Sequence, residues 1–317
     1  MRILHLIYSL NVGGAERMVI TLANYQVQSN QVGLCIINNL YSQKLLNELD
    51  SRIQVFRINR KKASRNILDV FQLNRYVFKF RPDILHIHDS DAILYIPIRS
   101  FYHTILTIHA MNLPLKGYKL YNQTVAISKA VADNTENRGL CRPEVIYNGI
   151  STSAIQRTKK NIPNAEQNFR IVQVGRLEHG IKGQHLILKA LHRLSSSHIS
   201  IDFIGDGSSY NYLKEVTRQL KLEKQVNFLG NCDIEWIYHH LCDYHLLVQP
   251  SISEGFGLTI AEGMAAEVPV LVSDLPAPLE IIDKGKQGYY FRHNDVDDLC
   301  RMLRYIIKHY EEALQLS

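Results

Sequence analysis

Short apolar runs alternate along the whole chain with longer amphipathic stretches. The short runs have the length of buried strands, and the longer stretches carry apolar residues at helical spacing. This alternation is typical of α/β proteins, in which helices connect the parallel strands of a sheet. We therefore expect parallel sheets whose two faces are covered by helices.

The first half of the chain contains seven predicted strands, at residues 3–8, 33–37, 54–58, 84–87, 104–108, 124–126 and 144–146. Helices fit between them, for example at residues 15–27, 68–80 and 129–138. We interpret residues 1–10 as the first buried strand, because the apolar stretch is too short for a signal peptide and no small-residue cleavage pattern follows it.

The second half repeats this plan, with strands predicted at residues 170–174, 200–204, 225–228, 245–248 and 268–272. The predicted helices are at residues 184–194, 209–220, 258–266 and 296–312. A polar segment, residues 151–168, follows the turn pair Asn148-Gly149 and reads as a linker. The pattern predicts two Rossmann-like domains, 1–155 and 165–317, that face each other across a cleft.

Composition supports a globular protein, because 46% of the 317 residues are hydrophobic and 21% are charged. No apolar run reaches the length of a membrane-spanning helix. The five cysteines are odd in number and scattered, and no C-x-x-C occurs. We expect free thiols and a cytoplasmic location, where cysteines stay reduced.

Positive charge is concentrated in the first half, which carries a net charge of +8, whereas the second half carries −2. The densest basic cluster comprises Arg57, Arg60, Lys61, Lys62 and Arg65. Such a cluster fits an anionic membrane surface, and a solvated loop is the alternative. No nucleic-acid motif occurs, so we expect no nucleic-acid partner.

The most informative motif is the segment 254–262, Glu-Gly-Phe-Gly-Leu-Thr-Ile-Ala-Glu, between a strand and a predicted helix. Glycine lets the backbone approach a ligand closely, and a helix start offers unpaired N–H groups to a phosphate. We expect Gly255, Phe256, Gly257, Leu258 and Thr259 to contact the ligand. At the two ends of the motif, Glu254 would accept hydrogen bonds from a sugar and Glu262 from a ribose diol.

A second motif, residues 175–183, places Arg176 and Lys182 directly after a strand. Two fixed cations there would stabilise a pyrophosphate leaving group, whose charge grows as a glycosidic bond breaks. The spacing is not that of a Walker A loop.

Three weaker signals also follow strands. Gly13-Gly14 opens the first predicted helix toward a diphosphate, and Gly205-Asp206-Gly207 suits a tight turn beneath a nucleotide base. His109 lies where it would orient a sugar hydroxyl, although a packed loop histidine gives the same pattern. His86 and His88 share a strand face, but with only Asp89 and Asp91 nearby we expect no metal site.

Five motifs of this sequence occur in the order seen in family 4 glycosyltransferases. They are the Glu254 to Glu262 segment, the Gly175 to Gly183 segment, the Gly13-Gly14-x-Glu16 loop, Gly205-Asp206-Gly207 and Asn148-Gly149-Ile150. The sequence resembles this family from residue 1 to about residue 300. The resemblance implies the GT-B fold and a retaining transfer from a nucleotide-diphosphate sugar, without a bound metal or cofactor.

Matching positions imply individual roles. Arg176 and Lys182 would hold the donor diphosphate, Glu254 the donor sugar and Glu262 the ribose, while His109 would lie near sugar and acceptor and Gly14 near the diphosphate. No residue is assigned as a protein nucleophile. The sequence departs from the family in a short stretch at residues 109–127 and in ending after one predicted helix.

We expect the acceptor to be a lipid-linked glycan of surface polysaccharide, reached by an enzyme that is peripheral at the inner face of the membrane. The basic first half motivates this expectation. The alternatives are another GT-B enzyme, such as a nucleotide-sugar epimerase or a phosphorylase, and a non-catalytic module that binds nucleotide sugars.

Overall fold

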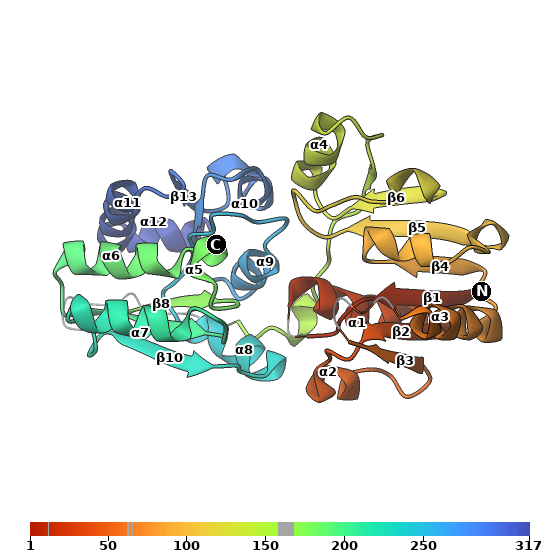
Figure 1. The fold of residues 1–317 in the computed structure, drawn as a ribbon. Helices are drawn as coiled ribbons and strands as arrows, with labels where there is room; N and C mark the ends of the chain where they lie inside the picture. Colours follow the sequence, from red (N-terminus) through yellow and green to blue (C-terminus); the bar gives the residue numbers. More distant parts are fainter. Residues whose placement is uncertain (12, 62–63, 65, 158–167) are drawn as a thin grey trace. The chain divides into compact units, whose positions relative to one another are not determined.

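The computed structural model describes residues 1–11, 13–61, 64, 66–157 and 168–317. The chain divides into two compact units, Met1–Asn148 and Gly149–Ser317. Each unit contains one parallel sheet with helices packed against it (Figure 1). The described residues between the last strand of the first unit and the first strand of the second include only one short 3-10 turn, η4 (Thr152–Ala154).

In the first unit, the N-terminal unit, the sheet has the strand order β3-β2-β1-β4-β5-β6-β7, and every pairing is parallel. The strands are β1 (Arg2–Ile7), β2 (Gln31–Asn38), β3 (Gln54–Arg60), β4 (Ile84–Ile87), β5 (His103–Ile108), β6 (Gln123–Ala126) and β7 (Glu144–Val145). The helices are α1 (Gly14–Gln26), α2 (Gln43–Asn47), α3 (Ile67–Phe80) and α4 (Lys129–Asn137), with 3-10 turns η1 (Ser90–Tyr95), η2 (Arg99–Phe101) and η3 (Tyr118–Leu120).

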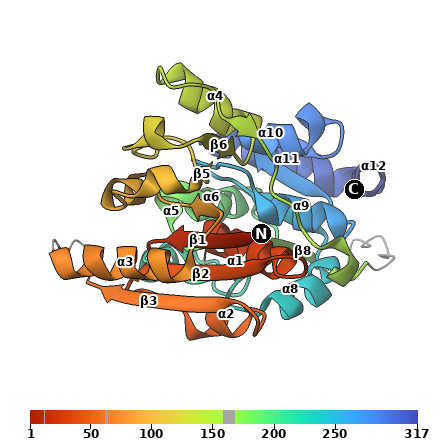
Figure 2. The same ribbon diagram turned by 90° about the vertical axis from the view of Figure 1, so that its right-hand side faces the viewer.

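The side chains of alternate residues of β1 point to opposite faces of this sheet. Leu4 and Leu6 pack in the same core cluster as Leu73 and Val77 of α3. Ile7 belongs to a second cluster, which contains the buried face of α1. Figure 2 shows α3 beside β2 and β3, with which it is in contact. The central strand is therefore buried on both faces, as in other parallel sheets.

The second unit, the C-terminal unit, has the strand order β10-β9-β8-β11-β12-β13, again with parallel pairing. Its strands are β8 (Phe169–Val174), β9 (Ile199–Ile204), β10 (Val226–Gly230), β11 (Leu246–Gln249), β12 (Val270–Ser273) and β13 (Tyr289–Phe291). Its helices are α5 (His179–Lys182), α6 (Gln184–Leu194), α7 (Tyr210–Gln219), α8 (Ile234–His240), α9 (Leu258–Ala265), α10 (Pro276–Ile281), α11 (Val296–Lys308) and α12 (Tyr310–Gln315), with 3-10 turns η5 (Leu241–Asp243) and η6 (Asp283–Gly285).

All twelve predicted strands correspond to strands of the described structure, whereas β13 was not predicted. The predicted single helix at residues 296–312 is wrong, because the backbone leaves the helical region at His309, where φ is −117° and ψ is 43°. Two helices, α11 and α12, therefore follow β13.

Both sheets reverse their strand order between the first strand and the fourth, at the β1/β4 pair and at the β8/β11 pair. Loops that follow the two strands of such a pair run in opposite directions and leave a crevice at the carboxyl ends. This is where ligands bind in open α/β sheets.

Two further findings concern the cysteines and membrane spans. None of the five cysteines, all of which lie in the described part of the chain, forms a disulfide, and Cys35, Cys242 and Cys300 are buried. None of the helices in the described part of the chain has both the length and the apolar character that crossing a bilayer requires.

Candidate active site

Three loops of the C-terminal unit meet at the carboxyl edge of its sheet. They follow the neighbouring strands β9, β8 and β11 and contain residues 205–207, 175–182 and 250–257. The topology therefore brings together the motifs that the sequence singled out.

The shortest contact between these loops joins Lys182 and Glu254, with 2.7 Å from Nζ to Oε2. Their side chains are 23% and 11% exposed, so this ion pair is only weakly screened by water. The same carboxylate oxygen accepts a hydrogen bond of 3.2 Å from the Ser251 hydroxyl. Glu254 thus fixes the position of the ammonium group at the β8/β11 switch point.

Arg176 lies on the same loop as Lys182 and is more exposed, at 46% of its side chain. Its guanidinium lies 3.5 Å from a carboxylate oxygen of Glu178, and its carbonyl oxygen accepts a hydrogen bond from the Gln184 side chain. Two cations therefore stand within seven residues at the end of one strand.

Glycines allow the loop backbones to pack closely. At Gly183 φ is +70°, and an added Cβ would lie 1.9 Å from the carbonyl oxygen of Pro250. At Gly205 φ is +135°, and a Cβ would lie 2.1 Å from the carbonyl oxygen of Gly175. These positions exclude any other residue, so the backbone contact between neighbouring loops depends on glycine.

The loop after β11 ends at Gly257, whose φ is +110° and which precedes Leu258, the first residue of α9. The N-cap residue Gly257 has no side chain that could cap α9, and the N–H groups of the first turn, at Leu258 and Thr259, lack intrahelical partners. Phe256 is buried beside them. The helix start is suited to bind an anion.

The remaining predicted residues of this unit lie on the same loops or on α9. Asp206 is exposed, and its carboxylate accepts a hydrogen bond from the N–H of Gly207 at 2.7 Å. Glu262 lies in α9 and is buried, with a carboxylate oxygen 3.4 Å from the Tyr238 hydroxyl.

In the N-terminal unit, Gly13 precedes α1 in an extended conformation and Gly14 is its first, exposed residue. His109 directly follows β5, and its Nε2 lies 2.9 Å from Nδ1 of His88. Nδ1 of His109 is buried and has no hydrogen-bond partner among the described residues.

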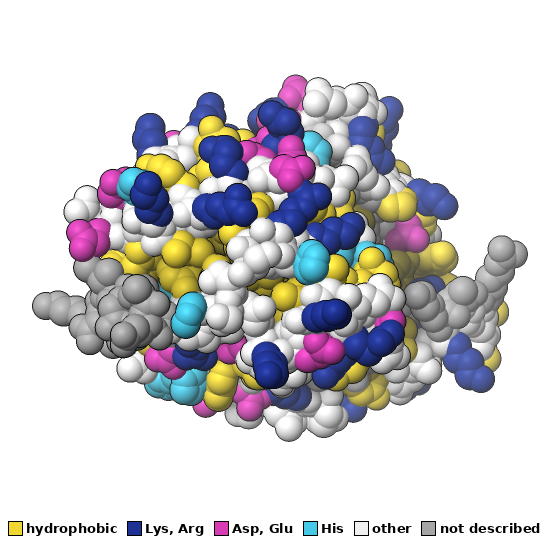
Figure 3. All heavy atoms as spheres, turned by 90° about the vertical axis from the view of Figure 1, so that its left-hand side faces the viewer, with side chains coloured by type: hydrophobic (Ala, Val, Ile, Leu, Met, Phe, Trp, Pro, Cys, Tyr) yellow, Lys and Arg dark blue, Asp and Glu magenta, His cyan; other side chains and the backbone are white. Residues whose placement is uncertain are grey.

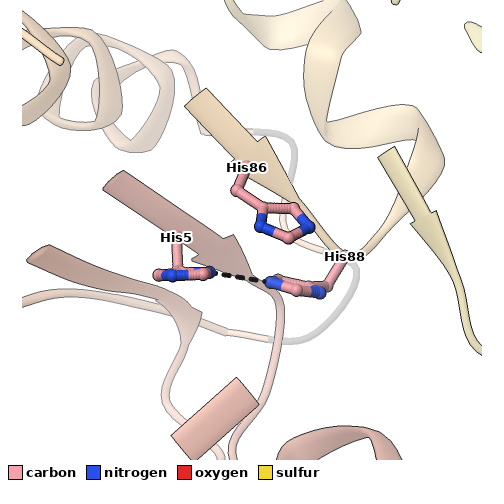
Figure 4. A group of neighbouring side chains, drawn as sticks. All are labelled: His5, His86 and His88. Atoms are coloured by element: carbon pink, nitrogen blue, oxygen red, sulfur yellow. Dashed lines mark hydrogen bonds between the residues drawn. The ribbon is translucent and has the colours of Figure 1, made fainter. Parts of the chain in front are cut away.

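His88 belongs to a buried group with His5 and His86, which Figure 4 shows on two neighbouring strands and the loop that follows β4. Nε2 of His88 lies 3.1 Å from Nδ1 of His5, and one ring nitrogen of each of the three residues lies within 4.8 Å of the others. Sequence reasoning considered His86 and His88 but missed His5, because its partners are 81 or more residues away along the chain.

Two family descriptions match this chain, and the boundary between the two matched ranges lies close to the boundary between the two structural units. Residues 154–317 match "Glycosyl transferases group 1", and residues 12–154 match "Glycosyltransferase Family 4". The chain belongs to glycosyltransferase family 4. It has the GT-B fold of this family, which confirms the predicted fold class.

Among the proteins similar to this chain are two glycosyltransferases and one solved structure of the same fold. An uncharacterized glycosyltransferase of Haemophilus influenzae is 23% identical, over 97% of this chain and 90% of that protein. The lipopolysaccharide 1,6-galactosyltransferase of Salmonella typhimurium is 25% identical, over 58% of this chain and 52% of that enzyme. The crystal structure of Anabaena HepE with UDP and glucose superposes with a TM-score of 0.83 at 22% identity, over 100% of this chain and 92% of that one.

Asp89 of the transferase lies just after β4, and the sequence did not assign it to a ligand. Burial raises the pKa of its carboxyl to about 6, although it accepts a 2.6 Å hydrogen bond from the N–H of Tyr8. It lines a pocket of about 260 Å³ together with Asp91 and Lys116. No motif indicates this pocket, because its walls come from three separate segments.

The basic cluster of the transferase is only partly solvated. Arg57 stacks on Tyr41, and Arg60 stacks on Tyr8 and donates to the Asn38 side chain. Lys61 is exposed. The other two members of the cluster, Lys62 and Arg65, lie outside the described residues.

Proposed function

We propose that this transferase moves a sugar from a nucleotide-diphosphate donor to a hydroxyl of a lipid-linked glycan, with retention of the anomeric configuration. The observation that carries the proposal is the Lys182–Glu254 pair at the β8/β11 switch point, with Arg176 on the same loop. HepE, a structure of similar fold, binds UDP and UDP-glucose, which supports the donor class.

In this proposal Lys182 and Arg176 bind the donor diphosphate, together with the start of α9. Glu254 holds Lys182 in place and accepts a hydrogen bond from a sugar hydroxyl, and Glu262 accepts one from the ribose. Gly13 and Gly14 approach the diphosphate, and Gly207 and Asp206 the base. Cationic side chains thereby stabilise the leaving group, and the reaction needs no metal ion or cofactor.

The reaction forms a bond between the acceptor hydroxyl oxygen and the anomeric carbon on the face that the diphosphate leaves. The bond from the anomeric carbon to the diphosphate oxygen breaks, and its electron pair stays on the diphosphate. A donor phosphate oxygen takes the hydroxyl proton. Charge builds on the diphosphate in the transition state, where fixed cations stabilise it most.

The outer face of α3 supports the proposed acceptor class. Ile67, Leu68, Phe71 and Phe78 lie on this face, are between 62% and 78% exposed, and recur at helical spacing. Arg75 and Lys79 are exposed on the same helix. Large apolar side chains interleaved with cations match the surface of an anionic membrane.

The C-terminal unit provides a contrast. Figure 3 shows basic and acidic side chains interspersed on the face that it draws. Ion pairs such as Arg218–Glu215 and Arg193–Asp297 neutralise the charges locally on this unit. We therefore assign the membrane contact to α3 and not to the C-terminal unit.

A screen of UDP-, GDP- and ADP-sugars tests the donor proposal. A donor that binds the folded chain raises its melting temperature, and release of the nucleoside diphosphate with transfer of the sugar to a lipid-linked acceptor establishes turnover. Binding without release on any acceptor would instead indicate a non-catalytic module, and inversion of a sugar stereocentre without an acceptor would indicate an epimerase.

Co-sedimentation with phosphatidylglycerol vesicles tests the membrane contact. The double variant Phe71→Ser with Phe78→Ser should reduce the bound fraction at least several-fold, because both aromatic rings lose their insertion into the interface. Tyr25→Ser is the matched control, since Tyr25 is 79% exposed but lies on α1. Equal binding of both variants and the unaltered chain would contradict the assignment.

A further inference from the structure

A chain of four hydrogen-bonded side chains runs through the N-terminal unit from the proposed substrate side to α1. Nε2 of His109 lies 2.9 Å from Nδ1 of His88, and Nε2 of His88 lies 3.1 Å from Nδ1 of His5. Nε2 of His5 lies 2.7 Å from Oε1 of Gln26. The three rings come from the ends of β5 and β4 and from the middle of β1, and the amide comes from the last residue of α1.

Burial keeps these imidazoles neutral. Loss of hydration lowers the pKa of His5 and of His109 to about 4, and it lowers the pKa of His88 well below its usual value. A neutral imidazole has one N–H donor and one bare nitrogen acceptor. Each ring can therefore donate a hydrogen bond to only one of its two neighbours in the series of hydrogen-bonded side chains.

The amide oxygen of Gln26 sets that direction. An oxygen without hydrogen can only accept, so His5 donates through Nε2 and accepts through Nδ1. His88 must then donate from Nε2 to His5 and accept at Nδ1. The proton between His88 and His109 belongs to Nε2 of His109, and Nδ1 of His109 carries a lone pair.

We propose that His88 and His5 are positioning residues that hold His109 as its Nε2–H tautomer, so that Nδ1 accepts a hydrogen bond from a hydroxyl of the bound sugar or acceptor. This inference rests on the proposed function and on the position near the sugar and the acceptor that the family resemblance implies for His109. The observation that points to a ligand is the buried Nδ1 of His109, for which the described part of the chain supplies no hydrogen-bond partner.

The proposal has a consequence for the kind of group that His109 recognises. A bare nitrogen can bind a hydroxyl, which donates, but it repels a carboxylate or phosphate oxygen, which only accepts. The position facing Nδ1 therefore takes a neutral hydroxyl-bearing part of the substrate and disfavours a carboxylate there.

The competing interpretation is a zinc site at His5, His86 and His88, whose ring nitrogens lie within 4.8 Å of one another. A metal would take a lone pair from one ring nitrogen of each residue. In the proposed arrangement Nε2 of His88 donates its proton to Nδ1 of His5, so neither nitrogen could bind a metal at the same time. The two interpretations therefore exclude each other at these nitrogens.

The direct test reads the tautomers in the full-length chain labelled with 15N-histidine. Two-bond nitrogen–proton correlations at pH 7.5 should show the Nε2–H form for His5, His88 and His109, and single His→Gln variants assign the signals. An Nδ1–H form of His109 would overturn the proposal. So would metal-bound nitrogen shifts together with one zinc per chain that a chelator removes.

A pair of near-isosteric variants separates positioning from packing. Gln26→Met removes the acceptor that orients the chain, and Thr107→Val removes the hydroxyl that lies 2.8 Å from Nε2 of His86, outside the chain. With UDP-glucose as the probe, Gln26→Met should mix the tautomers of His109 and lower the kcat of UDP release about tenfold, with KM within twofold. Thr107→Val should leave the His109 signals and kcat within twofold of the unaltered chain.

If both variants lowered kcat equally while the His109 tautomer stayed the same, His88 and His5 would have only a structural role. If the unaltered chain turned over no nucleotide sugar, the proposed function would fail, and the nitrogen signals would still decide the direction of the chain. The two failures are therefore distinguishable.

Discussion

The two units share a doubly wound topology but differ in the chemistry that lies at the switch point of the sheet. At the β8/β11 switch point, cations and a carboxylate stand on glycine-rich loops and remain partly exposed. At the β1/β4 switch point, imidazoles are buried and neutral. The same arrangement of strands can thus present fixed charge in one unit and oriented neutral dipoles in the other.

The difference follows from how much water each side chain keeps. Lys182 and Arg176 reach the site on flexible stems whose charged ends retain partial solvation. The side chains of His5 and His88 point from the sheet into the core, where a charged form would lose nearly all of its hydration. Under the proposed function, the C-terminal unit would stabilise developing charge, whereas the N-terminal unit would select and orient hydroxyl groups.

The largest effect is expected from Lys182→Met, which removes the ammonium and leaves Glu254 without its ion-pair partner. The kcat for release of the nucleoside diphosphate should fall by about 10²–10³-fold, the usual cost of removing one transition-state contact. Steady-state kinetics with the donor identified by the screen measure the loss. Glu254→Gln, which keeps a hydrogen-bonding side chain beside Lys182, should be less severe, and a rate within twofold of the unaltered enzyme for Lys182→Met would contradict the role of the pair.

Gly183→Ala should lower the free energy of unfolding by about 2–3 kcal/mol, because the backbone is left-handed there and the methyl group would meet the Pro250 carbonyl. Urea unfolding provides the measurement. Gly180→Ala is the matched control from the short helix α5 just before Gly183, since its φ is not positive and no described atom outside its own helix lies within 4 Å of the added methyl. Equal stabilities of the two variants would show that the close approach of the loops is unimportant.

Acidification should destabilise the N-terminal unit. The pKa values of His5 and His109 are near 4 in the folded chain and 6.5 in an unfolded one. The unfolded state therefore binds more protons between these values, and stability is lost as the pH falls from 6.5 toward 4. Each of these histidines contributes a slope of roughly 1.4 kcal/mol per pH unit within this range.

Asp89 contributes to the pH dependence of stability with the opposite sign, because its pKa is raised to about 6 and the folded state binds the extra proton below that pH. This contribution offsets that of about one histidine. Hydrogen exchange at pH 7 and pH 5 should accordingly reveal loss of protection in the first unit more than in the second. The variant His109→Gln should reduce the slope, and an unchanged slope would indicate that His109 is not buried as a neutral ring.

The smallest effect is expected for Tyr238→Phe. The Tyr238 hydroxyl is 3.4 Å from Glu262, a long distance that marks a weak hydrogen bond. Its loss should change the affinity for the donor nucleotide by about threefold or less, which calorimetry can measure. A loss of more than tenfold would mean that Glu262 depends on this hydroxyl for its orientation.

Much of the fold could be predicted from the sequence, because buried parallel strands are short apolar runs that stand out from their amphipathic neighbours. The runs at β4 and β5 are examples. The strand β13 is three residues long and the helix α10 begins at Pro276 within a short segment, so neither has enough periodicity to be recognised. The break between α11 and α12 depends on the backbone of His309, which no sequence pattern marks.

The sequence predicted the residues of the candidate site on each loop but not the contacts between loops. Lys182 and Glu254 were chosen from separate motifs, and their 2.7 Å contact comes from the adjacency of β8 and β11. The link from His109 to Gln26 was out of reach, since it needs four segments of the chain to be brought side by side. The site roles themselves stay predictions until the variants are made.

The arrangement of contacts along the chain also bears on how the protein is made. Each sheet consists only of strands from its own unit, Met1–Asn148 or Gly149–Ser317, so neither sheet needs a strand from the other half. The first sheet can assemble on the ribosome as soon as β7 has emerged, while the second is still being translated. In each sheet the central strand is synthesised first, and its pairing with the fourth strand can form only after the intervening residues have been made. Such long-range pairing favours slow folding.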